Sequence, residues 1–163
     1  MAELTNLESK LGEVLGLAMA AQGATTKVEG LLEDRTDLAT RLQEMRSQAE
    51  ETERRCVALA DELDGKKTAI LEKARETRQE AVEMMKTYLG DDADALDGFE
   101  FLTMAEAGEV GHWSIVRKFG EMAGDSEVLE LADWALPIQR GHFDVVLQAS
   151  LELAGDADPD GTA

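Results

Sequence analysis

The sequence has little of several residue types on which other protein classes depend. It contains one cysteine, Cys56, which cannot form an internal disulfide and which suits a reducing compartment. Two prolines, 4% aromatic residues and few β-branched runs leave little material for sheets and hairpin turns. The sequence also lacks an apolar run of about 18 residues and the basic and apolar segments of a signal peptide. These absences predict an all-α protein in the cytoplasm.

Positive charge is also scarce, because 35 acidic and 16 basic side chains give a formal net charge of −19. Such a surface repels the phosphates of nucleic acids and of anionic membranes, so we expect neither among the partners. The last residues are rich in Gly and Asp, a composition typical of disordered tails. The 163 residues therefore suit one helical domain over residues 1–154, followed by a disordered acidic tail over residues 155–163.

Helical periodicity is the feature that the sequence has in abundance. Thr5 with Glu8 forms a capping-box pattern at the start of the first periodic segment, and Asp97 with Glu100 forms another at the start of the fourth. We expect four of the helices to form a core and the third to be the crossover that returns the chain over roughly 36 Å. The five periodic segments cover residues 4–32, 38–63, 66–89, about 98–123 and about 127–154.

Two predicted helices carry polar side chains where the spacing demands apolar ones. The inward stripe of the fourth helix includes Glu109 and His112, and that of the fifth includes Gln139 and His142. Both pairs belong to a repeated [Glu/Gln]-x-Gly-His-aromatic pattern at an offset of 30 residues. Counted from the turn near Gly124, all four lie at a similar depth, so antiparallel packing should bring them together in the interior. A glutamate and a histidine one turn apart can supply two ligands to a metal ion.

At these residues the sequence resembles the ferritin-like superfamily, with Glu109-Val110-Gly111-His112 as one half of its paired Glu-x-x-His motif. The resemblance implies a ferritin-like four-helix bundle with an additional crossover helix. It also implies a stress-related protein that binds iron, with manganese or zinc as alternatives, and that reacts with oxygen or peroxide. A closer resemblance is to the YciF-type stress-associated family, through Glu51-Thr52, the separate helix over residues 66–89, His112-Trp113-Ser114-Ile115 and Phe119-Gly120.

Under this hypothesis Glu109, His112 and His142 bind the metal directly. Gln139 is a weak ligand or a donor to bound oxygen, and Glu53 or Glu106 supplies a further carboxylate.

A second hypothesis assigns these polar residues a structural role. The first helix offers no carboxylate at the depth of the predicted site, because residues 18–23 are apolar, small or neutral. This favours a non-enzymatic helical stress or interaction protein in which the ancestral site has become a hydrogen-bonded layer. Whether the chain is an enzyme stays open, and a homodimer is the expected assembly.

Overall fold

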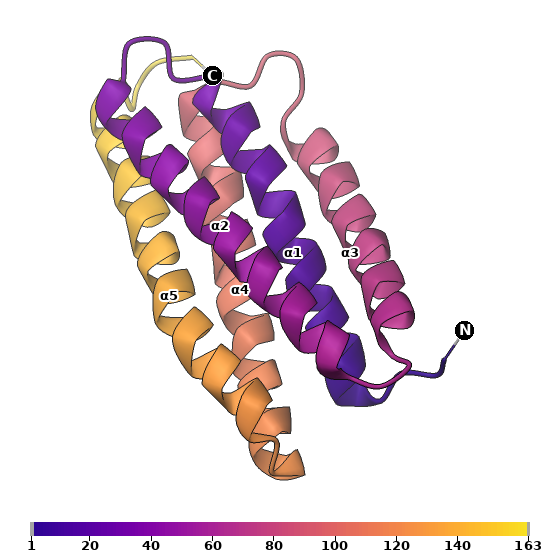
Figure 1. Ribbon diagram of the computed structural model, residues 1–163. Coiled ribbons are helices and arrows are strands. Elements are labelled where there is room, and N and C mark those ends of the chain that lie inside the picture. The colour runs from indigo at the N-terminus through magenta and orange to yellow at the C-terminus, as the bar shows by residue number, and fades with distance from the viewer. Residues whose placement is uncertain (1, 163) are drawn as a thin grey trace.

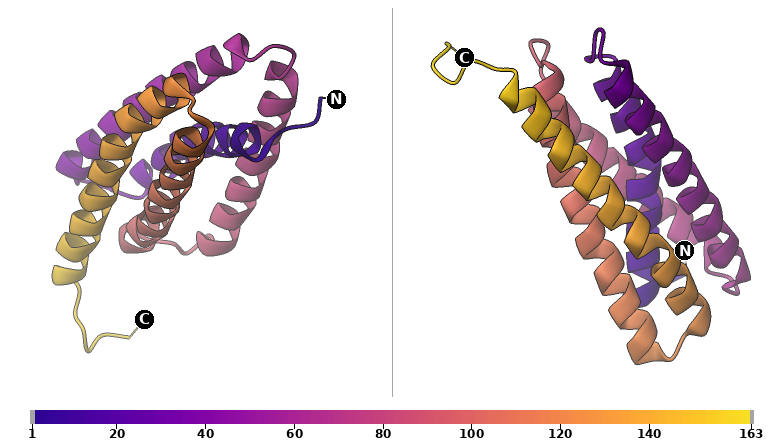
Figure 2. Two further views of the ribbon diagram at one scale, coloured as in Figure 1. Left: turned by 90° about the horizontal axis from the view of Figure 1, so that it is seen from below. Right: turned by 90° about the vertical axis from the view of Figure 1, so that its left-hand side faces the viewer.

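The computed structural model describes residues 2–162, and these residues form five helices and no strand (Figures 1 and 2). The all-α class predicted from the composition is therefore confirmed. The predicted segments also match the observed helices to within a few residues at each end. The helices are α1 (Asn6–Glu29), α2 (Thr36–Glu62), α3 (Lys67–Tyr88), α4 (Ala95–Ala123) and α5 (Ser126–Gly155).

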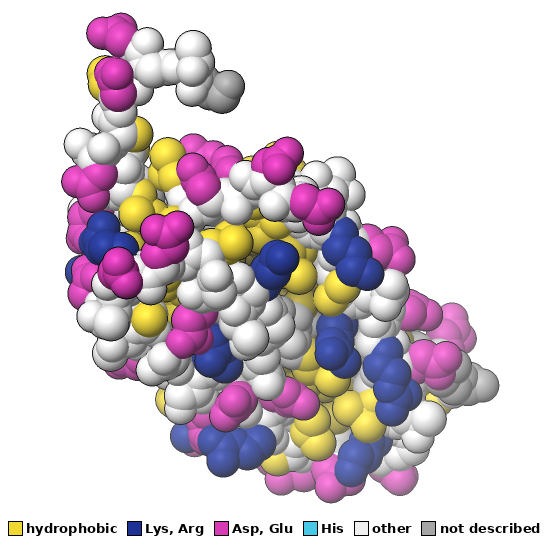
Figure 3. Space-filling view, turned by 90° about the horizontal axis from the view of Figure 1, so that it is seen from above, with side chains coloured by type: hydrophobic (Ala, Val, Ile, Leu, Met, Phe, Trp, Pro, Cys, Tyr) yellow, Lys and Arg dark blue, Asp and Glu magenta, His cyan; other side chains and the backbone are white. Residues whose placement is uncertain are grey.

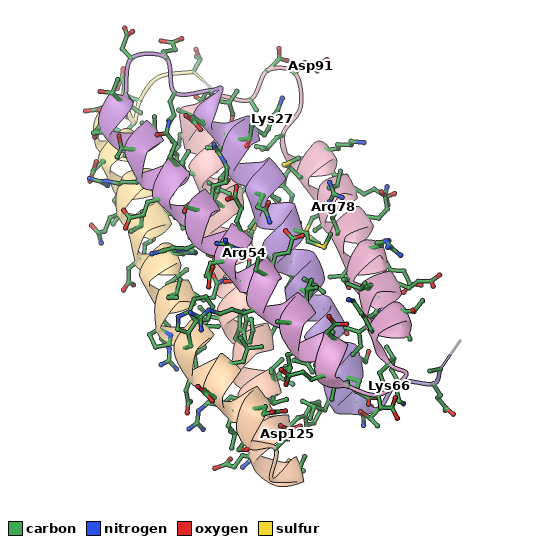
Figure 4. All side chains as sticks on the ribbon, viewed as in Figure 1. Lys27, Arg54, Lys66, Arg78, Asp91 and Asp125 are labelled. Atoms are coloured by element: carbon green, nitrogen blue, oxygen red, sulfur yellow. The ribbon has the colours of Figure 1, made fainter. Side chains whose placement is uncertain are left out.

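The chain runs up and down through a bundle of these helices. Figure 4 marks Lys66 and Asp125 at the two turns of one end, and Lys27 and Asp91 at the opposite end. The turn from α4 to α5 is made at Gly124, whose φ of 66° lies in the left-handed region that glycine adopts without strain. α1 contacts α2, α3 and α4, whereas α5 contacts α2 and α4. The third helix therefore lies on α1, away from α5.

Side-chain caps begin α1, α4 and α5, whereas α2 and α3 have no side-chain cap. The hydroxyl of Thr5 accepts a hydrogen bond from the Glu8 backbone N–H at 3.2 Å, and the Glu8 carboxylate accepts one from the Thr5 N–H at 2.7 Å. The predicted capping box of the first helix is thus confirmed. The box predicted to begin at Asp97 is wrong, because Asp94 is the N-cap, Asp97 is its partner and α4 starts at Ala95. The observed box, Asp94 with Asp97, has the same spacing as the predicted one and lies three residues earlier in the chain.

Two apolar cores fill the bundle, one toward each end. One core contains the largest buried side chain, Trp113, together with the start of α5, and the other contains Phe99 and the end of α5. α1, α2, α4 and α5 each contribute to both cores, and on each of them several residues that belong to neither core lie between the two groups. Polar side chains of α4 and α5 occupy this middle level.

The part of the chain after α5 has no helix. Residues 156–162 form turns and bends, and Figures 2 and 3 show them leading away from the helices with acidic side chains exposed. Ala163, the last residue of the predicted tail, lies outside the described residues. Within residues 2–162, none of the helices combines the length and the apolar character that crossing a lipid bilayer requires.

Candidate functional site

A layer of four buried polar side chains separates the two apolar cores. Glu106 and Glu109 on α4 are 2% and 3% exposed, and Gln139 and His142 on α5 are 2% and 5% exposed. We call these four residues the polar layer. The structure thus brings together four residues of the predicted site: Glu109, Gln139, His142 and Glu106, the last of which was predicted as a supplementary carboxylate.

Contacts between helices join the polar layer. Nε2 of Gln139 donates a hydrogen bond to Oε2 of Glu109 at 2.7 Å. Nδ1 of His142 lies 3.6 Å from Oε2 of Glu106, and its Nε2 is hydrogen-bonded to Oε1 of Gln48 on α2. The layer therefore connects α2, α4 and α5 at one level of the bundle.

Within residues 2–162, the two glutamates of the layer have no Lys or Arg partner. In this part of the chain, Glu106 has an ion-pair contact with His142, and no Lys or Arg side chain lies within ion-pair distance of Glu106 or Glu109. Burial raises the pKa of Glu106 to about 8. Burial and the neighbouring Glu106 raise the pKa of Glu109 well above its ordinary value, against the opposing effects of His142 and Gln139. Burial lowers the pKa of His142, although Glu109 opposes this effect.

Two oxygen atoms of the layer are left without partners. Oε2 of Glu106 and Oε1 of Gln139 are buried and have no hydrogen-bond partner. A buried carboxyl group without a compensating partner is costly as an anion, so it must hold a proton or face a cation. The layer can therefore take up positive charge.

Of the two histidines predicted to point into the interior, His142 is buried in the polar layer, whereas His112 is half-buried against α1 and lies outside the layer. The side chain of His112 is 35% exposed, and its Nδ1 lies 3.1 Å from Oε2 of Glu13 on α1. The inward face of α4 instead holds Glu106, Glu109 and Trp113, and Trp113 is completely buried. The physical reason is that the indole has much more apolar surface than an imidazole, so its burial determines how α4 is rotated.

Glu53, the other predicted supplementary carboxylate, lies beside the layer rather than in it. Its Oε2 accepts a hydrogen bond from Nε2 of Gln22 on α1 at 2.5 Å. Burial is the main cause that raises the pKa of the nearby Cys56 thiol to about 12, and the charges of Glu53 and Glu109 add to the effect. The fully buried Ala18 lies between the α1 residues of the two cores, so α1 brings no carboxylate into the polar layer, although its Glu13 lies beside His112.

Sequence reasoning missed two residues that contact the predicted site. Gln48 binds His142, and Glu13 lies beside His112. Neither residue has a local signature in the sequence, because a glutamine or a glutamate on the flank of a helix is usually solvated. Only the three-dimensional arrangement of α1 and α2 against α4 and α5 identifies them.

The polar layer is not a preformed metal site. Within residues 2–162, no group of three or more His, Cys, Asp or Glu side chains is arranged so that it could hold a metal ion. The contacts of Glu109 and His142 run instead to the amides of Gln139 and Gln48.

Cavities reach the layer from two sides. A cavity of about 700 Å³ lies between α1, α3 and α4, and Glu106 and Glu109 line it. A smaller cavity of about 240 Å³ lies between α2 and α5, where His142, Gln48 and Gly141 line it. Small molecules or ions in these cavities would meet the polar layer directly.

Similarity to known proteins does not identify the site. Comparisons with protein-family models, with curated proteins and with solved structures find no match to this chain. The functional argument therefore rests on the residues of the polar layer and of the cavities beside it.

Proposed function

We propose that this chain is a ferritin-like protein that binds a divalent metal ion in its polar layer. The observation that carries the proposal is the burial of two carboxyl groups, Glu106 and Glu109, with no Lys or Arg at ion-pair distance. A divalent cation compensates two buried carboxylates, whereas a neutral amide does so only in part. Iron is the proposed metal, and manganese and zinc accept the same types of ligand.

The side chains of the layer are of the types that bind such an ion, and they would have to rearrange to hold it, because no three of them form a metal site within residues 2–162. Glu106, Glu109 and His142 would hold it, and Oε1 of Gln139, which has no hydrogen-bond partner, would be a neutral oxygen ligand. Binding would replace the contacts of Glu109 with Gln139 and of His142 with Gln48. Bound iron would supply redox chemistry toward oxygen or peroxide, and the buried side chains would keep bulk water away from the ion.

The arrangement of the helices supports the ferritin-like part of the proposal. α1, α2, α5 and α4 contact one another in a ring, and α3 leads from the end of α2 to the start of α4 (Figure 1). This is the arrangement expected of a four-helix core with an added crossover helix. We include in the proposal a cytoplasmic location and a homodimer, and the exposed Ile115 and Met122 on α4 are apolar surface that a dimer could bury.

A second candidate function is supported by the same layer. The hydrogen bonds of Gln139 with Glu109 and of His142 with Gln48 already satisfy part of it. A layer of this kind can fix the register of packed helices in a non-enzymatic stress or interaction protein. The two candidates differ in whether the protein responds to metal.

The test is metal analysis of protein purified without chelators and without metal-affinity resin. We expect about one or two metal ions per chain, and a melting temperature that rises with added Fe(II), Mn(II) or Zn(II). His142→Leu should abolish this rise, while the matched variant His112→Leu should keep it, because His112 lies outside the layer. Protein that is free of metal and indifferent to all three ions would favour the structural role.

A further inference from the structure

The cavity between α1, α3 and α4 is shaped for an elongated molecule. α3 packs on α1 and touches α4 only slightly, and Figure 2 shows α3 and α4 diverging from their connecting loop. The part of α3 that lines the cavity extends from Lys73 to Tyr88, which is roughly 22 Å of helix. A volume of about 700 Å³ lies within the usual range for a small-molecule site.

Most of the cavity wall is apolar. Methionines form much of it, and their flexible thioethers adapt to ligands of irregular shape. Met84, Tyr88 and Met104 are 59%, 57% and 44% exposed, so apolar surface continues to the mouth of the cavity. The larger apolar side chains of the wall are Leu17, Met84, Met85, Phe101, Leu102 and Met104.

Two helical glycines keep the cavity open. Gly23 on α1 and Gly108 on α4 line the cavity, and a Cβ added at either would meet no atom within 4 Å. Gly12 differs, because a Cβ there would lie 2.8 Å from the Cβ of Lys73 on α3. Helix packing therefore explains Gly12, but it does not explain two residues that weaken their helices and leave empty space.

The inner wall of the cavity carries a buried carboxyl group whose nearest basic contact is Nδ1 of His142, at 3.6 Å from Oε2 of Glu106. Glu106 lines the cavity, is 2% exposed, and has a buried Oε2 with no hydrogen-bond partner. The lysines of the lining are already paired, Lys10 with Glu13 and Lys73 with Glu76. The chain's net charge of −19 attracts cations to the molecule as a whole.

We propose that this cavity binds a cationic amphiphile, with its apolar chain between α3 and α4 and its single amino or ammonium group at Glu106. The apolar wall and the two open glycines suit the apolar chain of such a ligand, and the Oε2 of Glu106, which has no hydrogen-bond partner, suits its amino group. The site shares Glu106 with the proposed metal centre but does not require a metal. Its test is therefore made on chelator-treated protein.

The experiment is titration calorimetry of the full chain with dodecylamine, dodecanol and dodecanoate, each below its micelle concentration. We expect dodecylamine to bind once per chain, because its ammonium group supplies the cation that the buried Glu106 needs as a carboxylate. Dodecanoate should bind at least about tenfold more weakly, because it places a second carboxyl group beside Glu106. Glu106→Gln should weaken dodecylamine about tenfold and leave dodecanol unchanged. Glu100→Gln removes the same charge from the exposed face of α4, so it should change neither affinity.

Leucine substitutions test where the alkyl chain of the ligand lies. Gly108→Leu should fill the cavity and abolish binding of all three probes, and Gly23→Leu gives a second block from α1. Gly111→Leu is the matched control, because Gly111 is an open glycine of the same helix that does not line the cavity. The proposal is overturned if dodecylamine does not bind, if dodecanoate binds as tightly, if neither Gly108→Leu nor Gly23→Leu reduces binding, or if Glu106→Gln and Glu100→Gln have equal effects.

Discussion

Gln139 and Glu109, which occupy equivalent positions of a motif repeated 30 residues apart, face each other in the interior at 2.7 Å between Nε2 and Oε2. Each residue is buried, and each belongs to a different helix of the α4–α5 hairpin. The motif therefore brings an amide against a carboxyl group where two glutamates would place two carboxyl groups. The amide N–H lets the layer form without a cation, since it donates to the carboxyl group that a metal would otherwise compensate.

Gln139→Glu should separate the stability of the metal-free protein from that of the loaded one. Without metal, the new carboxyl group faces Glu109 and loses the donated hydrogen bond, so we expect a loss of about 2–3 kcal/mol at neutral pH. The loss should shrink as the pH falls, because protonation removes the repulsion. With Fe(II) or Mn(II), the cation supplies the missing partner, so the melting temperature should exceed that of the wild type and the Kd should fall.

Gln148→Glu is the control for Gln139→Glu, because Gln148 is an exposed residue of the same helix. It adds the same charge and should change neither stability nor metal affinity appreciably. Calorimetry that finds simple destabilisation and no metal binding in Gln139→Glu would identify the layer as structural and would remove the basis for the metal proposal.

The stability of the metal-free protein should decrease as the pH rises from 6.5 to 8. The folded protein raises the pKa of Glu106 to about 8, whereas the unfolded chain releases this proton near 4.5. The stabilisation from Glu106 is thus complete below the unfolded pKa and is lost as the pH approaches the folded one, with a slope of up to about 1.4 kcal/mol per pH unit. Glu109, whose pKa is also raised, adds to the slope in the same direction. Below 6.5, the lowered pKa of His142 acts in the opposite direction, because the unfolded chain then binds the extra proton.

Denaturant unfolding in the presence of chelator at several pH values measures this dependence. Glu106→Gln removes one of the two buried titrating carboxyl groups and should reduce the slope between pH 6.5 and 8, while Glu100→Gln on the exposed face of α4 should leave the slope unchanged. A wild-type protein whose stability is constant or increases over this range would show that Glu106 is ionised in the folded state.

The helices could be predicted from the sequence because their periodicity and turns are local properties. The rotation of α4 could not be predicted as well, since two adjacent stripes are nearly equally apolar on this helix. One stripe contains His112, and the other contains Glu106 and Trp113. The polar pattern favoured the first, but burying the indole of Trp113 gains more free energy than burying the imidazole of His112. The motif was thus a good guide to Glu109, Gln139 and His142 and a poor one to His112.

Substitutions on α4 should reflect this rotation. Trp113→Ala removes a completely buried indole from the first core, so we expect a loss of about 3–5 kcal/mol. His112→Ala removes a side chain that is 35% exposed, and we expect a loss below about 1 kcal/mol. Chemical denaturation of both variants gives the comparison. Similar losses in the two would mean that His112 shares the interior after all.

The contacts that complete the layer and the cavity depend on distances that no sequence pattern states. Gln48 is remote from His142 in the sequence. The cavity exists because α3 packs mainly on α1 and has little contact with α4. The glycines of α4 illustrate the difficulty, because Gly108 and Gly111 look alike in the sequence and both sit in helix interiors. Only the structure shows that neither is needed for a close approach of helices and that one of them lines a cavity.

Alanine should therefore have opposite effects at two glycines of the α4–α5 hairpin. At Gly111 an added Cβ meets no atom within 4 Å, and alanine favours the helix, so Gly111→Ala should stabilise the protein by up to about 1 kcal/mol. At Gly124 the space is equally open, but the φ of 66° strains any residue with a Cβ, so Gly124→Ala should cost about 1 kcal/mol. Because the surroundings of the two sites are alike, the difference in sign isolates the backbone conformation as its cause. Thermal unfolding of the two variants measures it. Stabilisation by Gly124→Ala would mean that the turn between α4 and α5 does not use the left-handed conformation, and the depth at which α5 places Gln139 and His142 would then differ from that described above.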